Sequence, residues 1–253
     1  MAAQASAPPV DAVELRHVAE QATRWAQPLM ESLADGFVAL YLYGSAVDPG
    51  FDPKHSDVNM LLVAKALPAS TIRSLSEVWP GGGPVGAPAN LVAMSADQIT
   101  RAEDTFALEL SEVHHRGRLL AGEDILAQIE IPNDSLRHHL ERELRVLSVR
   151  LRRIYLESRD QSGALVGALA DGVGTVVACA RGIAYLRGST VPLSAESALH
   201  SAAEWVGVEP RAWLEAWNFR HEEHPPASVA SIYLDFLDAT TALMRGVDTH
   251  GEE

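Results

Sequence analysis

The pattern of apolar positions changes near residue 132 of the 253-residue chain. Before this point, short apolar runs bounded by glycine and proline are separated by helical patterns. A run of five to eight apolar residues between turn residues is too short for a buried helix and is typical of a strand. One of the runs, residues 106–113, alternates apolar and polar positions, which predicts a half-buried strand. The predicted strands are residues 37–43, 58–64, 90–94, 106–113 and 119–122, the last being a short edge strand.

Helical patterns lie between these runs. Residues 13–33 carry apolar groups at the spacing of an amphipathic helix. Residues 68–79 predict a second helix, whose inward-facing residues we expect to be Leu67, Ile72, Leu75 and Val78. Ser95, followed by Gln98 at the capping-box position, predicts the start of a third helix, because a serine hydroxyl accepts from the open amides of the first turn.

After residue 132 the pattern is helical throughout. Six apolar side chains recur every three or four positions and predict one long helix seam, formed by Leu136, Leu140, Leu144, Leu147, Leu151 and Tyr155. Further helices are expected at residues 165–186, 194–206, 210–219 and 228–244. The chain is therefore expected to be an α+β protein. It would have a disordered tail (1–9), a domain with a small mixed twisted β-sheet and flanking helices (10–132), an all-α helical bundle domain (133–247) and a short tail (248–253).

Composition narrows the function. The net charge of −14 argues against a nucleic-acid-binding face, which needs clustered positive charge. Cys179 is the one cysteine, so an intrachain disulfide is excluded and a cytoplasmic location is expected. The N-terminus lacks the basic and apolar segments of a signal peptide. Asp171 and several glycines interrupt residues 163–180, which argues against a membrane span.

The candidate chemistry lies between the first two strands. Gly44 and Ser45 follow the first strand, and Asp57 and Asn59 enter the second. Residues at i and i+2 of a strand project from one face, so two carboxylates placed there can hold two Mg²⁺ ions. A glycine allows close approach of a triphosphate, and a serine hydroxyl donates to a phosphate oxygen. Asn59, however, offers one neutral carbonyl oxygen where a second carboxylate is wanted.

This arrangement resembles the nucleotidyltransferase fold of the DNA polymerase β superfamily, in which a Gly-Ser pair and a variable loop precede Asp-x-Asp and an apolar strand. The preceding helix and the helical C-terminal part are similar to the aminoglycoside and minimal nucleotidyltransferases. The resemblance implies that Gly44 and Ser45 bind the nucleotide, that Asp57 is a metal ligand and that Asn59 occupies the second ligand position. It implies a bound Mg²⁺ ion, whose binding Asn59 would weaken, and a nucleoside triphosphate, expected to be ATP.

A third acid is expected from a later strand, where Asn90 is the aligned polar residue and Glu109 a substitute. The sequence thus predicts a nucleotidyltransferase-like protein with a degenerate metal site, weak nucleotide binding and little or no catalysis. The alternative is an active Mg²⁺-dependent enzyme that transfers a nucleotidyl group from ATP to a hydroxyl of a small molecule or protein. An interaction module built on the helical domain is a third hypothesis. A nucleotide and a small molecule in the interdomain cleft are the expected partners, with no membrane or nucleic acid, and a homodimer is left open.

Other polar clusters are less informative. The adjacent pair His114 and His115, if on a strand, would face opposite ways, and the neighbouring helical pair His138 and His139 is poorly placed for shared metal ligation. The segment His221–His224 lacks the register of a helical zinc motif. The arginines of residues 134–160 are expected to form ion pairs with Glu141 and Glu143, or else to meet a triphosphate. Three tryptophans of the helical part, Trp205, Trp213 and Trp217, are expected to pack in its core or to line a ligand.

Overall fold

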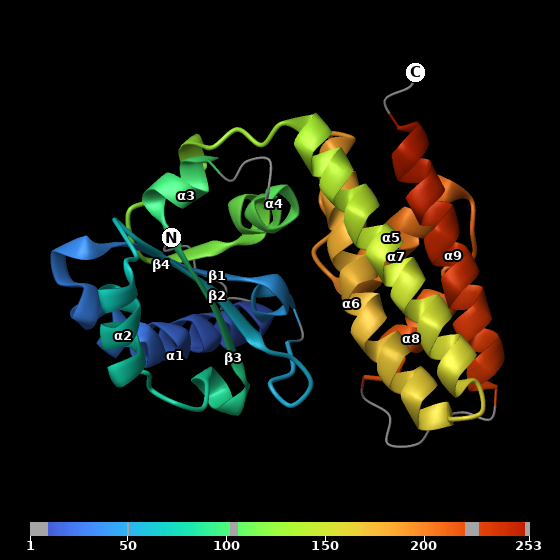
Figure 1. Ribbon diagram of the computed structural model, residues 1–253, viewed down its shortest axis with the longest axis horizontal. Helices are drawn as coiled ribbons and strands as arrows, with labels where there is room; N and C mark the ends of the chain where they lie inside the picture. Colours follow the sequence, from blue (N-terminus) through green and yellow to red (C-terminus); the bar gives the residue numbers. More distant parts are fainter. Residues whose placement is uncertain (1–9, 50, 102–105, 221–227, 251–253) are drawn as a thin grey trace, which may run out of the picture. The chain divides into compact units, whose positions relative to one another are not determined.

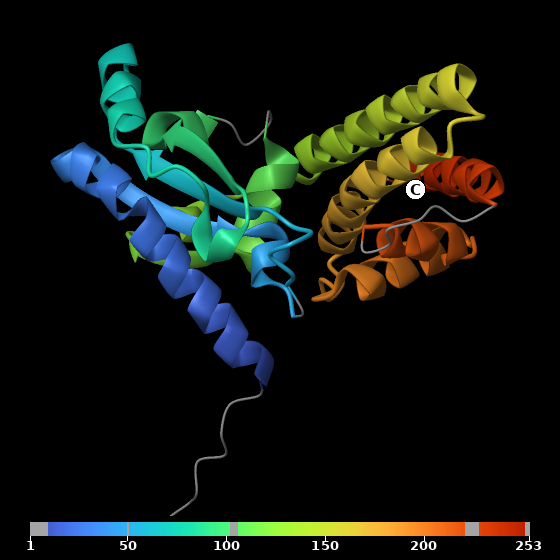
Figure 2. The ribbon, with the colours of Figure 1, turned by 90° about the horizontal axis from the view of Figure 1, so that it is seen from below.

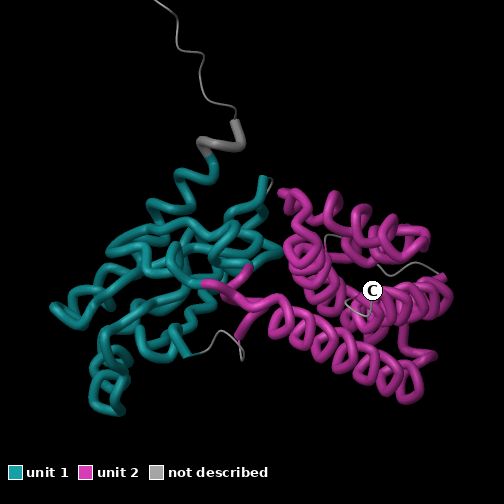
Figure 3. Tube along the Cα trace, turned by 90° about the horizontal axis from the view of Figure 1, so that it is seen from above, with its two compact units in different colours: residues 1–102, 112–129 teal, residues 103–111, 130–253 magenta. Residues whose placement is uncertain are grey.

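The computed structural model describes residues 10–49, 51–101, 106–220 and 228–250. The chain divides into two compact units, shown in Figure 3: residues 1–102 with 112–129, and residues 103–111 with 130–253. The sequence leads us to expect one boundary at residue 132. The division in the structure is different, because residues 103–111 group with the helical unit. The segment His221–His224 lies outside the described residues, as do the expected tail at 1–9 and the last residues of the chain.

The first unit is built on a four-stranded mixed sheet of order β3-β2-β1-β4 (Figure 1). Strand β1 pairs antiparallel with β2 and β4, whereas β2 and β3 run parallel. The strands are β1 (Phe37–Tyr43), β2 (Val58–Ala64), β3 (Ala89–Ser95) and β4 (Arg118–Gly122). The structure confirms four of the five predicted strands, including β4 as an edge strand.

The helices of this unit are α1 (Val10–Leu33), α2 (Ala69–Glu77) and α3 (Ala96–Arg101). Helix α4 (Ala107–Arg116) begins in the second unit and ends in the first. One face of the sheet packs on α1, which crosses beneath it in Figure 2. Alternation of side chains along β1 and β2 sends every second residue into this core, where Leu40, Leu42, Met60 and Leu62 meet Ala22 and Leu29 of α1. The opposite face therefore carries the odd-numbered residues of both strands.

Two local predictions are wrong. Of the four residues expected to face inward, Leu67 packs against the core and Leu75 of α2 is buried. Ile72 is 47% exposed, however, and Val78, the residue after the helix, is 37% exposed. Residues 106–113 do not form a strand but begin helix α4. Their alternation over a short window also fits a helix, whose period places Ala107, Leu110 and Ser111 on one buried side.

Tertiary packing explains why residues 107–116 form helix α4 rather than the expected strand. Leu108 lies against Gly182, where an added Cβ would stand 2.8 Å from the Leu108 Cδ1. At the other end of α4, Glu112 and Arg116 form an i,i+4 ion pair of 2.7 Å, a contact that only a helix provides. Tertiary packing thus fixes a segment that the alternation alone assigns to a strand.

The second unit is helical (Figure 1), and no strand occurs among the described residues after β4. Its helices are α5 (Asn133–Ser158), α6 (Ser162–Leu186), α7 (Ala195–Val206), α8 (Arg211–Asn218) and α9 (Val229–Thr249), the last ending two residues beyond the expected end of the domain. The predicted leucine seam of α5 is buried against α6 and α9. Ser194 caps α7 as expected, accepting from Ser197 N at 3.1 Å.

Helix α6 is the centre of this unit. Among the described residues it is the one helix long and apolar enough to cross a membrane, a weak signal by length and composition only. Half of its apolar window is buried, and it packs against α5, α7, α8 and α9, as the core helix of a bundle does. Trp213 of α8 is fully buried there and donates from Nε1 to the Thr240 hydroxyl at 3.3 Å, which confirms core packing for this tryptophan.

Candidate functional site

The candidate site lies on the sheet face opposite α1, at the edge where β1 ends and β2 begins. Val58 and Met60 are fully buried, whereas Asp57 is exposed and Asn59 half-buried. The alternation of the strand therefore points Asp57 and Asn59 away from the core, as their i, i+2 spacing requires. Tyr43, the last residue of β1, is the cross-strand partner of Asn59.

Asn59 and Asn90 meet side by side. Strands β2 and β3 are parallel and in register, so that these two residues are partners across the ladder. The Asn90 amide donates from Nδ2 to the Asn59 Oδ1 at 2.8 Å. The oxygen with which Asn59 would coordinate a cation is thus already engaged, and the predicted third position of the site holds its hydrogen-bond donor.

Gly44 lies next to the side-chain amide of Asn59. Its φ is +71°, a left-handed conformation that favours glycine, and a Cβ at this residue would stand 2.6 Å from Asn59 Nδ2. A short 3₁₀ turn, Gly44–Val47, follows, and Asp48 N donates to the Ser45 carbonyl at 3.0 Å. The structure therefore gathers Gly44, Asn59 and Asn90 into one polar cluster, with Asp57 and Ser45 adjoining it in sequence.

A buried ion network, which the sequence reasoning missed, anchors the Gly44–Val47 turn. Arg116 of α4 pairs with Asp48, the residue after the turn, and with Glu112 at 2.7 Å. The three side chains are 5%, 10% and 13% exposed, so breaking one partner would leave an uncompensated charge in the interior. The signal was the i,i+4 spacing of Glu112 and Arg116, which a strand assignment hides.

Glu109 lies on helix α4 rather than on a strand of the sheet, so the expectation that it follows β3 as a strand residue is wrong. Its carboxylate stands 3.9 Å from Nδ1 of the buried His139, which also accepts from Leu108 N at 3.3 Å. His139 thus serves the first turn of α4 as a hydrogen-bond acceptor. The pair His114 and His115 also lies on α4, with the two rings in edge-to-face contact. Partial desolvation, and secondly the neighbouring His114, lower the pKa of His115.

The donor set does not fit a pair of divalent cations. Of the three positions where carboxylates are expected, only Asp57 carries one, and the two amides are bonded to each other. Among the described residues, no group of three or more His, Cys, Asp or Glu is placed to hold a metal ion. Magnesium prefers carboxylate, phosphate and water oxygens, and one carboxylate does not compensate two such ions.

Helix α5 of the second unit carries several ion pairs. Arg145 of α5 pairs with Glu141 and Asp248, and Arg142 with Glu143, which confirms the expected ion pairs. Cys179 is fully buried, and burial raises the pKa of its thiol above the usual range, so the thiolate is disfavoured.

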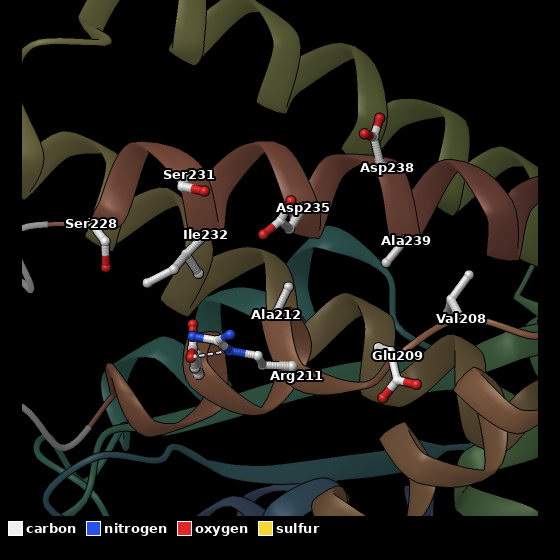
Figure 4. A pocket seen from close by; sticks show the side chains of 11 residues that line it. Val208, Glu209, Arg211, Ala212, Ser228, Ser231, Ile232, Asp235, Asp238 and Ala239 are labelled. Carbon is white, nitrogen blue, oxygen red and sulfur yellow. Dashed lines mark hydrogen bonds and ion pairs between the residues drawn. The ribbon is translucent and has the colours of Figure 1, made fainter.

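A hollow of about 420 Å³ lies between α8 and α9, with Asp235 and Asp238 on its rim (Figure 4). The Arg211 Nε donates to Glu215 at 2.8 Å beside it, and the rim carboxylates are exposed. Acidic side chains on an open surface are solvated, and they do not by themselves define a ligand.

No protein-family model matches the chain, and no curated protein matches it. Among solved structures, it is similar to spectinomycin adenyltransferase AAD(9) from Enterococcus faecialis, solved with ATP and spectinomycin. The TM-score is 0.56 at 14% sequence identity, over 88% of this chain and 98% of that one. The likeness shows the fold that the two chains share: a mixed sheet with flanking helices followed by a helical region.

Proposed function

We propose that this chain is a nucleotide-binding protein with the nucleotidyltransferase fold, and that it transfers a nucleotidyl group slowly or not at all. The observation that carries the proposal is the hydrogen bond between Asn59 and Asn90. It occupies, with two neutral amides, the two positions where the predicted chemistry needs carboxylates.

The size of the expected loss follows from the charge. Metal ions that neutralise a transferring phosphoryl group contribute several kcal/mol to transition-state stabilisation. Because about 1.4 kcal/mol corresponds to a factor of ten, losing one ligand carboxylate is expected to cost roughly a hundredfold to ten-thousandfold in rate. Losing the second costs more. The sheet and the Gly44 turn do not depend on these charges, which supports binding without turnover.

The proposed ligand is ATP or another nucleoside triphosphate at Gly44, Ser45, Asn59 and Asp57. The spectinomycin adenyltransferase was solved with ATP and spectinomycin, which supports a nucleotide together with a small molecule for this chain as well. The net charge of −14 supports a ligand other than nucleic acid. A cytoplasmic location is part of the proposal.

The test measures nucleotidyl transfer and binding separately. Purified full-length protein is incubated with labelled ATP, Mg²⁺ and hydroxyl acceptors, and ATP binding is measured by calorimetry on the same preparation. We expect binding without appreciable transfer. Robust turnover that Asp57→Ala abolishes would refute the proposal in favour of an active enzyme, and absence of ATP binding would refute the nucleotide ligand. The double variant Asn59→Asp/Asn90→Asp should bind Mg²⁺ more tightly than the parent protein.

A further inference from the structure

The amide pair presents donors where a metal site presents acceptors. A carboxamide carries two N–H groups and one carbonyl oxygen, whereas a carboxylate carries only acceptor oxygens. The bond from Asn90 uses the Asn59 oxygen and one of the four N–H groups of the pair. The Asn59 nitrogen lies close to Gly44: a Cβ added to Gly44 would stand 2.6 Å from Asn59 Nδ2. The Asn59 side chain therefore turns an N–H donor, not its oxygen, towards the turn.

The cluster is also less negative than a site with three carboxylates. Three carboxylates at residues 57, 59 and 90 would repel a phosphate unless cations were bound between them, whereas here Asp57 is the one charge of the three. Asp57 is exposed, so its repulsion of an anion a few ångströms away is near the value in water, equivalent to about a 3- to 10-fold change in affinity. Hydrogen-bond donors can offset a penalty of this size.

We propose that this site, which rests on the proposed nucleotide-binding function, takes its nucleotide as a metal-free anion. The side-chain N–H groups of Asn59 and Asn90 and the Ser45 hydroxyl donate to phosphate oxygens in place of a divalent ion. Asp57 is then a repulsive neighbour of the ligand rather than a metal ligand. The sign of its contribution to affinity is opposite to the sign in a two-metal site.

The experiment is a calorimetric titration of the full chain with ATP, once in EDTA and once in excess Mg²⁺. We expect binding in EDTA at least as tight as in Mg²⁺. Asp57→Asn should tighten binding in EDTA by about 3- to 10-fold, because it removes a like charge and keeps the shape. Asn59→Asp should weaken binding in EDTA by a similar factor and introduce a dependence on Mg²⁺.

The controls separate local from general effects. Asn59→Asp keeps an acceptor for the Asn90 Nδ2, so the fold is expected to persist, and circular dichroism checks it. Glu77→Gln removes one exposed charge of α2, which packs on α1, and should leave the affinity unchanged. Binding only in Mg²⁺, or weaker binding by Asp57→Asn, overturns the inference while the proposed function stands. Absence of binding in both buffers overturns both.

Discussion

Replacing Gly44 by alanine tests the contact on which the site geometry depends. A residue with a Cβ in the left-handed region costs about 1–2 kcal/mol. At Gly44 the new Cβ would also stand 2.6 Å from Asn59 Nδ2, closer than a Cβ can approach a neighbouring atom, so the Asn59 side chain must move. Moving it breaks the 2.8 Å bond from Asn90, worth about 0.5–1.5 kcal/mol. The expected total loss of unfolding free energy is about 1.5–3.5 kcal/mol.

Gly81→Ala is the matched control. Gly81 lies in the same unit with φ +70°, almost the value of Gly44, but nothing lies within 4 Å of its added Cβ. It should lose only the backbone part, about 1–2 kcal/mol. The assay is urea denaturation followed by circular dichroism and tryptophan fluorescence, with the midpoints compared at constant slope.

A double-mutant cycle completes the test. In an Asn59→Ala background the clash is absent, so Gly44→Ala should cost no more than Gly81→Ala does, and the cycle should show a coupling of about 1 kcal/mol. Equal losses for Gly44→Ala and Gly81→Ala in the parent protein would show that Asn59 does not rest on Gly44. The described arrangement of the amide pair would then be wrong.

Three further outcomes are expected. Burial raises the pKa of Tyr41 and of Tyr233 to about 12. Because the pKa in the folded state exceeds the usual value, the contribution of these groups to folding stability is complete below pH ~10 and is lost as the pH rises towards 12. Absorbance titration and denaturation across that pH range would detect the loss. Ser95→Ala should cost about 1 kcal/mol, since the Ser95 hydroxyl accepts from Gln98 N at 3.1 Å and caps α3, and Gln98→Ala, which removes the reciprocal bond, should show a smaller loss. Leu75→Ala should cost about 2–3 kcal/mol while Ile72→Ala, at an exposed position of the same helix, changes stability by under about 0.5 kcal/mol, and equal losses by thermal denaturation would contradict the packing of α2.

Local pattern was sufficient for most of the fold. The buried runs 37–43 and 58–64 match β1 and β2 residue for residue, because a strand with both faces covered needs a continuous apolar run. The α5 seam was equally readable, since side chains three and four apart share one face. The capping box at Ser95 is also a local device, in which both partners lie within four residues.

Residues 106–113 show where pattern fails. Apolar alternation over eight positions fits a strand and a helix alike, and the decision came from Leu108 against Gly182, a contact between residues far apart in the chain. Because this segment is a helix, Glu109 is not the third acid on a strand that the pattern predicts but lies next to His139. The Asp48–Arg116 pair was hidden for the same reason, because its partners are separated by 68 positions.

For the site, the sequence by itself determined the inventory: one carboxylate at Asp57 and amides at Asn59 and Asn90. Only the tertiary structure decided that the two amides meet, because the parallel register of β2 and β3 is set by long-range pairing. It also decided that the Asn59 oxygen faces Asn90 and that its nitrogen faces Gly44. Residue identity fixes what charge a site can carry, whereas the direction of each donor and acceptor depends on neighbours that only the folded chain brings together.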